Sequence, residues 1–253
     1  MRYVFSLLIG LTMGSFANVC ILRLPKDESL IVPPSHCPHC GRPLKAIHNI
    51  PVFSYLALRG RCAFCRVRIS LQYPLIEVLM AAVYIFHAWY FPEMLRLALA
   101  DILGFFLICI SLIDYRSRII PDELSLSLVA IGLAFSFINP FLDGTLWIKF
   151  LKSLGSGLGG GILMFLLAYS GEKAFKKEAL GGGDVKLIAA SGVILGWIGI
   201  VGPLFVGSLT GGLTAIILLM AKKKRMGETL PFGPFLSLGI YLTCLFPGIL
   251  NFP

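Results

Sequence analysis

The sequence predicts an all-α polytopic membrane protein with about eight transmembrane helices and one zinc-knuckle-like cytoplasmic loop. Three observations support this fold class. Of the 253 residues, 57% are hydrophobic, 14% are charged and the mean hydropathy is +0.86, which is more apolar than a soluble domain of this length. Apolar runs of roughly 17 to 25 residues, long enough to cross a bilayer as helices, recur along the chain. Two pairs of cysteines lie in its one sizeable polar segment.

The apolar runs give the expected spans in order. Because about 20 residues cross the hydrocarbon, we expect spans at residues 3–22, 71–91, 97–114, 123–141, 153–170, 184–202, 203–221 and 233–250. Glycine and proline interrupt the last three, and Pro203 is expected to mark a tight turn or a kink. The first run resembles a signal peptide, but only Arg2 precedes it and the stronger positive charge follows it. We therefore expect it to be a retained helix.

The basic residues predict the orientation of the spans. If the N-terminus lies outside and the spans alternate, the inside segments hold 18 of the 22 Lys and Arg residues; these segments are 23–70, 115–122, 171–186 and 222–232. Cytoplasmic loops of membrane proteins collect Lys and Arg. This bias accounts for the net charge of +9 without a nucleic-acid partner. Both termini are then expected outside.

The inside segment 23–70 carries the sequences CPHC and CAFC, which contribute Cys37, Cys40, Cys62 and Cys65. Each CxxC brings two thiolates to one ion, and two such knuckles complete a tetrahedron. Stable disulfides are not expected in the cytoplasm, and a bound metal would supply folding energy to a loop without a core. We therefore predict a structural zinc site. Free thiols or a redox pair are the alternatives, and His36 and His39 are expected to be bystanders.

Two aspartates are expected at the cytoplasmic face of the membrane. Asp114 ends the third span and Asp184, in the sequence GGGD, begins the sixth. When two carboxyl groups lie close together, one keeps its proton and the other acts as a base. Such a pair can activate water against a peptide carbonyl and protonate the leaving amine. Gly181, Gly182 and Gly183 carry no side chains and would let an extended substrate approach closely.

Structural roles are the alternative for each aspartate. Asp184 could only cap its helix, and Asp114 could be an interfacial charge paired with Arg116 or Arg118. Asp122 is a rival acid, but it follows a proline at a helix start, a position that suits capping.

The chain resembles the type IV prepilin peptidases, the bacterial leader peptidases among the GxGD intramembrane aspartyl proteases. The resemblance extends over nearly the whole chain and includes segments in a fixed order. These are GSFANVCILRLP, the two CxxC pairs, NIPVFSYLALRGRC, ISLQYPLIEVLMA, DYRSRIIPD, LGGGDVKLIAASGVILG and LPFGPFLSLG.

The resemblance implies an enzyme of the bacterial inner membrane. It would cut the basic leader from prepilins and pseudopilins at the cytoplasmic face and methylate the new N-terminus with S-adenosylmethionine. The family's catalytic aspartates correspond to Asp114 and Asp184, and its metal-site cysteines to Cys37, Cys40, Cys62 and Cys65. Residues 1–22 would be the first helix, 23–70 the zinc loop and possible methyltransferase region, and 71–253 the peptidase core.

Two other functions compete with this one. A non-enzymatic scaffold could dock a partner of a secretion or pilus machine through the zinc loop. A proton-coupled transporter is disfavoured, because both acids are expected at one membrane face rather than near its middle.

Overall fold

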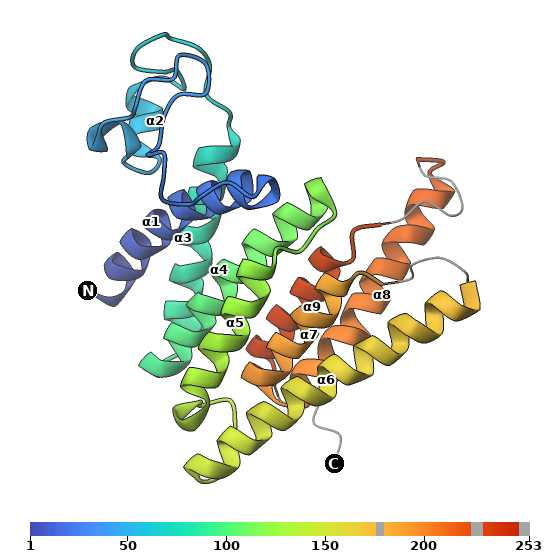
Figure 1. Ribbon diagram of the computed structural model, residues 1–253. Coiled ribbons are helices and arrows are strands. Elements are labelled where there is room, and N and C mark those ends of the chain that lie inside the picture. The colour runs from blue at the N-terminus through green and yellow to red at the C-terminus, as the bar shows by residue number, and fades with distance from the viewer. Residues whose placement is uncertain (176–179, 224–229, 248–253) are drawn as a thin grey trace. The chain divides into compact units, whose positions relative to one another are not determined.

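The computed structural model describes residues 1–175, 180–223 and 230–247, and these residues are mostly helical (Figure 1). The longer helices are α1 (Arg2–Arg23), α3 (Gln72–Tyr90), α4 (Met94–Ser117), α5 (Asp122–Phe135), α6 (Leu146–Phe175), α7 (Gly182–Leu195), α8 (Ile198–Met220) and α9 (Gly233–Leu245). The short helices are η1 (Leu24–Lys26), η2 (Ala46–Asn49), α2 (Phe53–Ala57) and η3 (Ser136–Ile138). The described residues contain no β-strand beyond two isolated bridges.

Each expected span overlaps one of the eight longer helices. Five of them, α1, α3, α4, α6 and α8, are long and apolar enough to cross a membrane. The helices α5, α7 and α9 have 14, 14 and 13 residues, fewer than the roughly 20 that a full crossing needs. The all-α polytopic class is therefore confirmed and the chain is an integral membrane protein, while the number of eight crossings stays a prediction.

The chain forms two compact units, residues 1–105 and 106–253. Helix α4 gives its N-terminal half to the first unit and its C-terminal half to the second. The functional division into residues 1–22, 23–70 and 71–253 stays a prediction.

In the first unit α1 packs against α3 through two glycines. A Cβ atom added at Gly10 or at Gly14 would lie 2.6 Å from a Cα atom of α3. Glycines four residues apart let two helix backbones approach this closely, as in the GxxxG motif of membrane helices. The Nδ2 of Asn18, one turn further along α1, donates a hydrogen bond of 3.1 Å to the carbonyl of Tyr73. This bond fixes the α1–α3 pair close to the start of α3.

The second unit is built around α7, which packs against α5, α6, α8 and α9. Most of its side chains are buried. Its neighbours approach closely at glycines. A Cβ added at Gly132 of α5 would lie 2.7 Å from the Val193 side chain, and one at Gly192 of α7 would lie 2.7 Å from the carbonyl oxygen of Ser156 in α6. The helix is therefore enclosed by backbone as well as by side chains.

The C-terminal carbonyl groups of α7 are satisfied by side chains from outside the helix. A helix leaves its last four carbonyl groups without partners inside the helix, and burial would make that costly. Asn139 donates from Nδ2 to the carbonyl of Ile194 at 2.7 Å, and the hydroxyl of Ser153 donates to the carbonyl of Val193 at 2.7 Å. Two of the last carbonyl groups of α7 thereby have partners.

The expected boundary between spans at residues 202 and 203 is corrected by the structure. Helix α7 ends at Leu195, and Gly196 follows with φ of 70°, a conformation that suits glycine. Pro203 instead lies inside α8. Its ring has no N–H to give to the carbonyl of Gly199, four residues earlier. That carbonyl accepts the Ser191 hydroxyl at 2.6 Å, so the proline is tolerated within the helix.

Helix α6 begins seven residues before the expected span 153–170 and ends five residues after it. Lys149 and Lys152, which lie between the expected spans 123–141 and 153–170, are therefore helical. Their ammonium groups donate hydrogen bonds of 2.9 Å to the carbonyls of Asn139 and Asp143. Long lysine side chains can reach polar groups from an apolar helix in this way, which is why the charges did not end the helix.

We predict that Gly14→Ala destabilises the protein by about 1–3 kcal/mol, because its new methyl group has no space against the α3 backbone. Gly155→Ala is the matched control, since a Cβ at Gly155 meets nothing within 4 Å. Thermal unfolding in detergent should show a lower midpoint for Gly14→Ala only. Equal midpoints for the two variants would contradict the close α1–α3 packing.

Candidate active site and metal centre

Asp114, the first of the two expected acids, is buried in the last turn of α4. Its Oδ2 accepts a hydrogen bond of 2.8 Å from the backbone N–H of Gly233, the first residue of α9. The first N–H groups of a helix have no partner inside the helix and carry partial positive charge. The start of α9 therefore holds one oxygen of this carboxyl group.

Asp184, the second acid, is the third residue of α7 and is also buried. Its Oδ2 accepts a hydrogen bond of 3.2 Å from the backbone N–H of Gly181, the residue before the helix. Asp184 therefore does help to cap its helix: from the third position of the first turn, its side chain accepts the N–H of the N-cap residue Gly181. For both acids, the hydrogen bonds described involve one carboxyl oxygen and a backbone N–H group.

The two carboxyl groups lie close enough to interact electrostatically. Further contacts join the segment between α4 and α5 to the start of α7, at one end of the second unit (Figure 1). A Cβ added at Gly183 would lie 2.6 Å from the Cβ of Ile120, and Lys186 forms an ion pair of 2.5 Å with Asp122. These contacts bring two segments expected on the inside, 115–122 and 171–186, together beside Asp184.

Two of the alternatives to a catalytic pair are Asp122 as a rival acid and Arg118 as a charge partner of Asp114. Asp122 is the first residue of α5, after the N-cap Pro121, and the helix start has no side-chain capping hydrogen bond; its exposed carboxylate instead binds Lys186 at the surface. Arg118 attracts Asp114 electrostatically. Both contacts lie beside Asp114 and Asp184.

The three glycines before Asp184 differ in their surroundings. Gly181 and Gly182 are exposed, and a Cβ at Gly182 would meet nothing within 4 Å. Gly183 instead packs against Ile120, which leaves no room for a side chain. Open backbone beside the acids is therefore provided by Gly181 and Gly182, whereas Gly183 is required by packing.

Sequence reasoning missed the role of Gly233. A Cβ at this position would lie 2.8 Å from Oδ2 of Asp114 and 3.0 Å from its Cγ. Only glycine therefore lets the start of α9 reach that carboxyl group. The sequence LPFGP marks a helix start, but nothing in it indicates a partner 119 residues earlier in the chain.

The Cys-rich loop of the first unit contains two knuckles with the same backbone design. In the first, the N–H of Cys37 donates to the carbonyl of Arg42 and Gly41 donates back to Cys37. In the second, Cys62 donates to Val67 and Arg66 donates back to Cys62. Gly41 and Arg66 occupy the equivalent turn position, with φ of 68° and 60°. Arg66 thus adopts a left-handed conformation that is uncommon for a residue with a side chain.

The knuckles bring the sulfur atoms of Cys37, Cys40, Cys62 and Cys65 within 4.8 Å of one another. The Sγ atoms of Cys37 and Cys65 are 3.8 Å apart. Four sulfurs at about 2.3 Å from a zinc ion lie about 3.8 Å apart along each edge of the tetrahedron. The cluster therefore has the donor set and the dimensions of a metal site and is compatible with zinc.

The cysteines of this cluster are free rather than disulfide-bonded. The backbone amides of Cys65 and Phe64 lower the pKa of the Cys62 thiol to about 6, which favours its thiolate form, whereas burial and hydrogen bonds with the other cysteines raise the pKa of the Cys65 thiol to about 11. The two histidines beside the cluster are not among its possible ligands. His36 is bonded through Nδ1 to the carbonyl of Pro34, so its expected role as a bystander agrees with its contacts.

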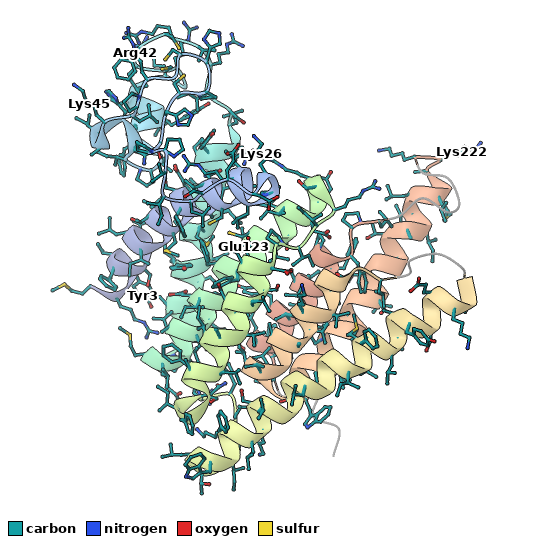
Figure 2. All side chains as sticks on the ribbon, in the orientation of Figure 1. Tyr3, Lys26, Arg42, Lys45, Glu123 and Lys222 are labelled. Atoms are coloured by element: carbon teal, nitrogen blue, oxygen red, sulfur yellow. The ribbon has the colours of Figure 1, made fainter. Side chains whose placement is uncertain are left out.

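The outer surface of the loop carries basic side chains. Arg42 and Lys45 stand on this surface (Figure 2), and the Arg42 guanidinium lies over the Phe64 ring at 5.5 Å from its centre. A cation over an aromatic face is weakly stabilising at an exposed site. The contact links the two knuckles from outside the sulfur cluster.

The chain is similar to known proteins over most of its length. The bacterial peptidase A24 N-terminal domain matches residues 8–91, and the type IV leader peptidase family matches residues 101–216. A protein of Aeromonas hydrophila named prepilin leader peptidase/N-methyltransferase is 34% identical over 96% of this chain and 89% of its own length. Proteins of the same name from Pectobacterium carotovorum and Myxococcus xanthus are 35% and 36% identical, over 91% and 86% of this chain and 88% and 63% of their own lengths. No solved structure matches the chain. The chain therefore belongs to the type IV leader peptidase family.

Proposed function

We propose that this protein is a membrane-embedded aspartyl endopeptidase that removes the basic leader from type IV prepilins and pseudopilins and methylates the new N-terminus. The observation that carries the peptidase assignment is the pair of buried, interacting carboxyl groups of Asp114 and Asp184. Each is held by a backbone N–H at a helix start. The names of the relatives support both activities.

The acidic pair accounts for the peptidase reaction. One carboxyl group keeps its proton because two neighbouring carboxylates cannot both ionise cheaply. The ionised member takes a proton from water, and the water oxygen attacks the scissile carbonyl carbon. The carbon–nitrogen bond then breaks, and the protonated member gives its proton to the leaving amine. The backbone N–H groups of Gly181 and Gly233 hold the two carboxyl groups in position for these transfers.

The bilayer would set the position of the substrate. Prepilins of this family carry a basic leader, a cleavage site and then an apolar helix. With that helix in the membrane, the scissile bond lies at the cytoplasmic face and can pass over the exposed backbone of Gly181 and Gly182. The leader's Lys and Arg residues would lie near anionic headgroups. Glu172 or Glu178 could also contact these basic residues. Glu172 is exposed, and Glu178 lies outside the described residues.

Zinc and S-adenosylmethionine are the proposed cofactors of this enzyme. The four-cysteine cluster would hold the zinc ion. S-adenosylmethionine would supply the methyl group as an electrophilic carbon on a sulfonium. The location would be the bacterial inner membrane with both termini outside, because the expected inside segments hold most of the Lys and Arg residues.

Replacing either acid by asparagine should abolish cleavage. Asp114→Asn and Asp184→Asn keep the size of the side chain but remove its acid–base function, and we expect losses of about 10²-fold or more in rate. Purified variants in detergent with a prepilin substrate provide the measurement. Near wild-type cleavage by either variant would reject the acidic pair, and a non-enzymatic scaffold would tolerate both changes.

Gly233→Ala should impair cleavage without removing a chemical group. Its methyl group would displace the Asp114 carboxyl group, and a misplacement of about 1 Å can cost about a hundredfold in rate. We expect kcat to fall more than KM rises. Gly212→Ala is the control, because a Cβ there meets nothing within 4 Å. Unchanged kcat in Gly233→Ala would mean that α9 does not position Asp114.

Metal analysis should find about one zinc ion per chain. Cys62→Ser should lose the metal because a tetrahedral thiolate site needs all four ligands, whereas His39→Ala should retain it. Mild chelation should have little effect on the cleavage step, since the acidic pair uses no metal ligand. A metal-free protein with an ordered loop, or a native Cys37–Cys40 disulfide, would count against the zinc site.

Cleavage should depend on the distance between the scissile bond and the apolar helix of the substrate. Moving the cleavage site several residues toward the leader, with the helix unchanged, lifts the bond away from the depth of the acids. We expect the rate to fall steeply in membranes or detergent. A rate that ignores this spacing would mean that recognition depends on the leader alone.

A further inference from the structure

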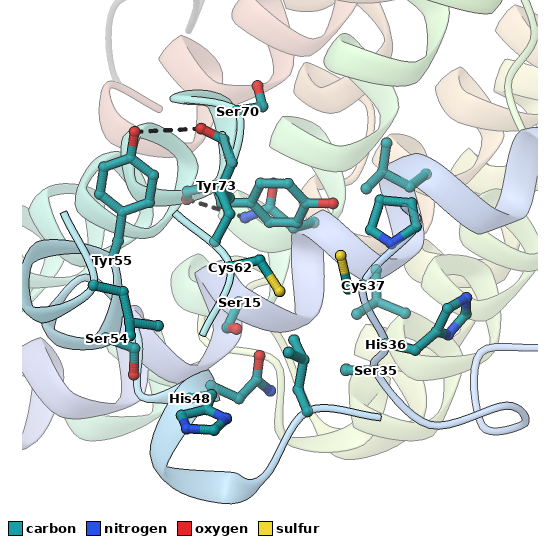
Figure 3. Close-up of a pocket in the computed structure, with 18 of the residues that line it drawn as sticks. Ser15, Ser35, His36, Cys37, His48, Ser54, Tyr55, Cys62, Ser70 and Tyr73 are labelled. Atoms are coloured by element: carbon teal, nitrogen blue, oxygen red, sulfur yellow. Dashed lines mark hydrogen bonds between the residues drawn. The ribbon is translucent and has the colours of Figure 1, made fainter. Parts of the chain in front are cut away.

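The first unit has a partly open cavity of about 630 Å³ between the Cys-rich loop and the helices α1 and α3 (Figure 3). All its lining residues lie between residues 15 and 77, so it is separate from the acidic pair in the second unit. Pockets for small organic ligands typically occupy roughly 300–1,000 Å³. The volume therefore suits a molecule of cofactor size.

Hydrogen bonds between loop and helices define the walls of this cavity. The backbone N–H of Val52 donates to Oε2 of Glu77 at 2.7 Å, and the Tyr55 hydroxyl donates to the carbonyl of Ile69 at 3.4 Å. Val52 has φ of 62°, a strained conformation for a β-branched residue. Such strain persists where surrounding contacts enforce it, and it is frequent at ligand sites.

The cavity lining is chemically mixed, as a ligand with both apolar and charged parts requires. The rings of Tyr55 and Tyr73, the Ser15 side chain and the sulfurs of Cys37 and Cys62 lie around it (Figure 3). Aromatic faces bind flat heterocycles and cations. Because Cys37 and Cys62 also belong to the four-cysteine cluster, the candidate metal site forms part of the cavity wall.

Glu77 contributes a buried carboxyl group to the cavity wall. Only 6% of this residue is exposed. The hydrogen bonds described for its carboxyl group come from neutral donors, the Val52 N–H and the Ser15 hydroxyl. A buried carboxylate is costly unless a positive charge is nearby. A cationic ligand in the cavity would supply that charge.

We propose that this cavity is the binding site of the methyl donor and that the Glu77 carboxylate faces its sulfonium cation. The inference rests on the proposed methyltransferase activity and gives it a location. S-adenosylmethionine combines a sulfonium, an amino-acid end and an adenine ring, which match the carboxylate, the basic residues and the aromatic rings of the lining. The basic residues are Arg23, Lys26 and Arg68.

The charge of the sulfonium provides the test. S-adenosylhomocysteine has the same adenosine and amino-acid ends but a neutral sulfur. Glu77→Gln keeps the acceptor oxygen for Val52 and removes only the negative charge. Calorimetry with the full chain in detergent should show that this variant binds S-adenosylmethionine at least about tenfold more weakly, with a much smaller change for S-adenosylhomocysteine.

Two controls make the result specific. Glu93→Gln is the same chemical change at an exposed residue of the first unit whose side chain pairs with Arg96, and it should bind both compounds like the wild type. Zinc content equal to the wild type would show that Glu77→Gln retains the folded loop. As a measurement without any variant, ultraviolet crosslinking of labelled S-adenosylmethionine should label peptides within residues 15–77.

The outcomes separate this proposal from the peptidase. Equal affinities of Glu77→Gln and wild type, equal losses for both compounds, or crosslinks confined to the second unit would overturn the site. Absence of donor binding to a wild-type protein that cleaves prepilin would overturn both the site and the methyltransferase half of the proposed function. The assignment of Asp114 and Asp184 would stand in each of these cases.

Discussion

The enclosure of α7 is the constraint on which the second unit depends. A helix buried on most sides must satisfy its terminal backbone groups without water. At its C-terminus Asn139 and Ser153 supply donors to its last carbonyl groups. At its N-terminus the acceptor is a carboxyl group, that of Asp184. The Asp184 carboxyl group therefore has two roles: it pairs a backbone N–H at the start of α7, and it is one of the two acids of the proposed reaction.

The second acid is held by the same physical device. Asp114 is at the end of α4, where the helix macrodipole is unfavourable to a negative charge, but its carboxyl group accepts a hydrogen bond from the start of α9. Two helix starts thus converge on two carboxyl groups that interact with one another. Fixed backbone donors of this kind need little reorganisation during a reaction. Gly183 and Gly233 make the arrangement possible because side chains there would collide with Ile120 and Asp114.

In the first unit, the Cys-rich loop has few buried apolar residues and depends on other contacts for its shape. The two knuckles bring four thiols together, and Glu77 ties the strained Val52 backbone to α3. The close approach of α1 and α3 at Gly14 brings α1 against the backbone of Glu77 itself. The cysteine cluster, the loop and the helix pair therefore share the walls of one cavity, and disturbing any of them should alter the others.

The sequence by itself determined the all-α membrane class, the approximate helices and the four-cysteine cluster, because hydrophobic length and CxxC spacing are local properties. It also singled out Asp114 and Asp184, through the charge bias of the loops and the family resemblance. It could not locate the break at Gly196, since Pro203 is tolerated only because Ser191 satisfies the carbonyl that the proline leaves unpaired. Gly233 at Asp114 and Val52 at Glu77 were likewise decided by the tertiary structure, because these contacts join residues 119 and 25 positions apart, and no local pattern encodes such a distance.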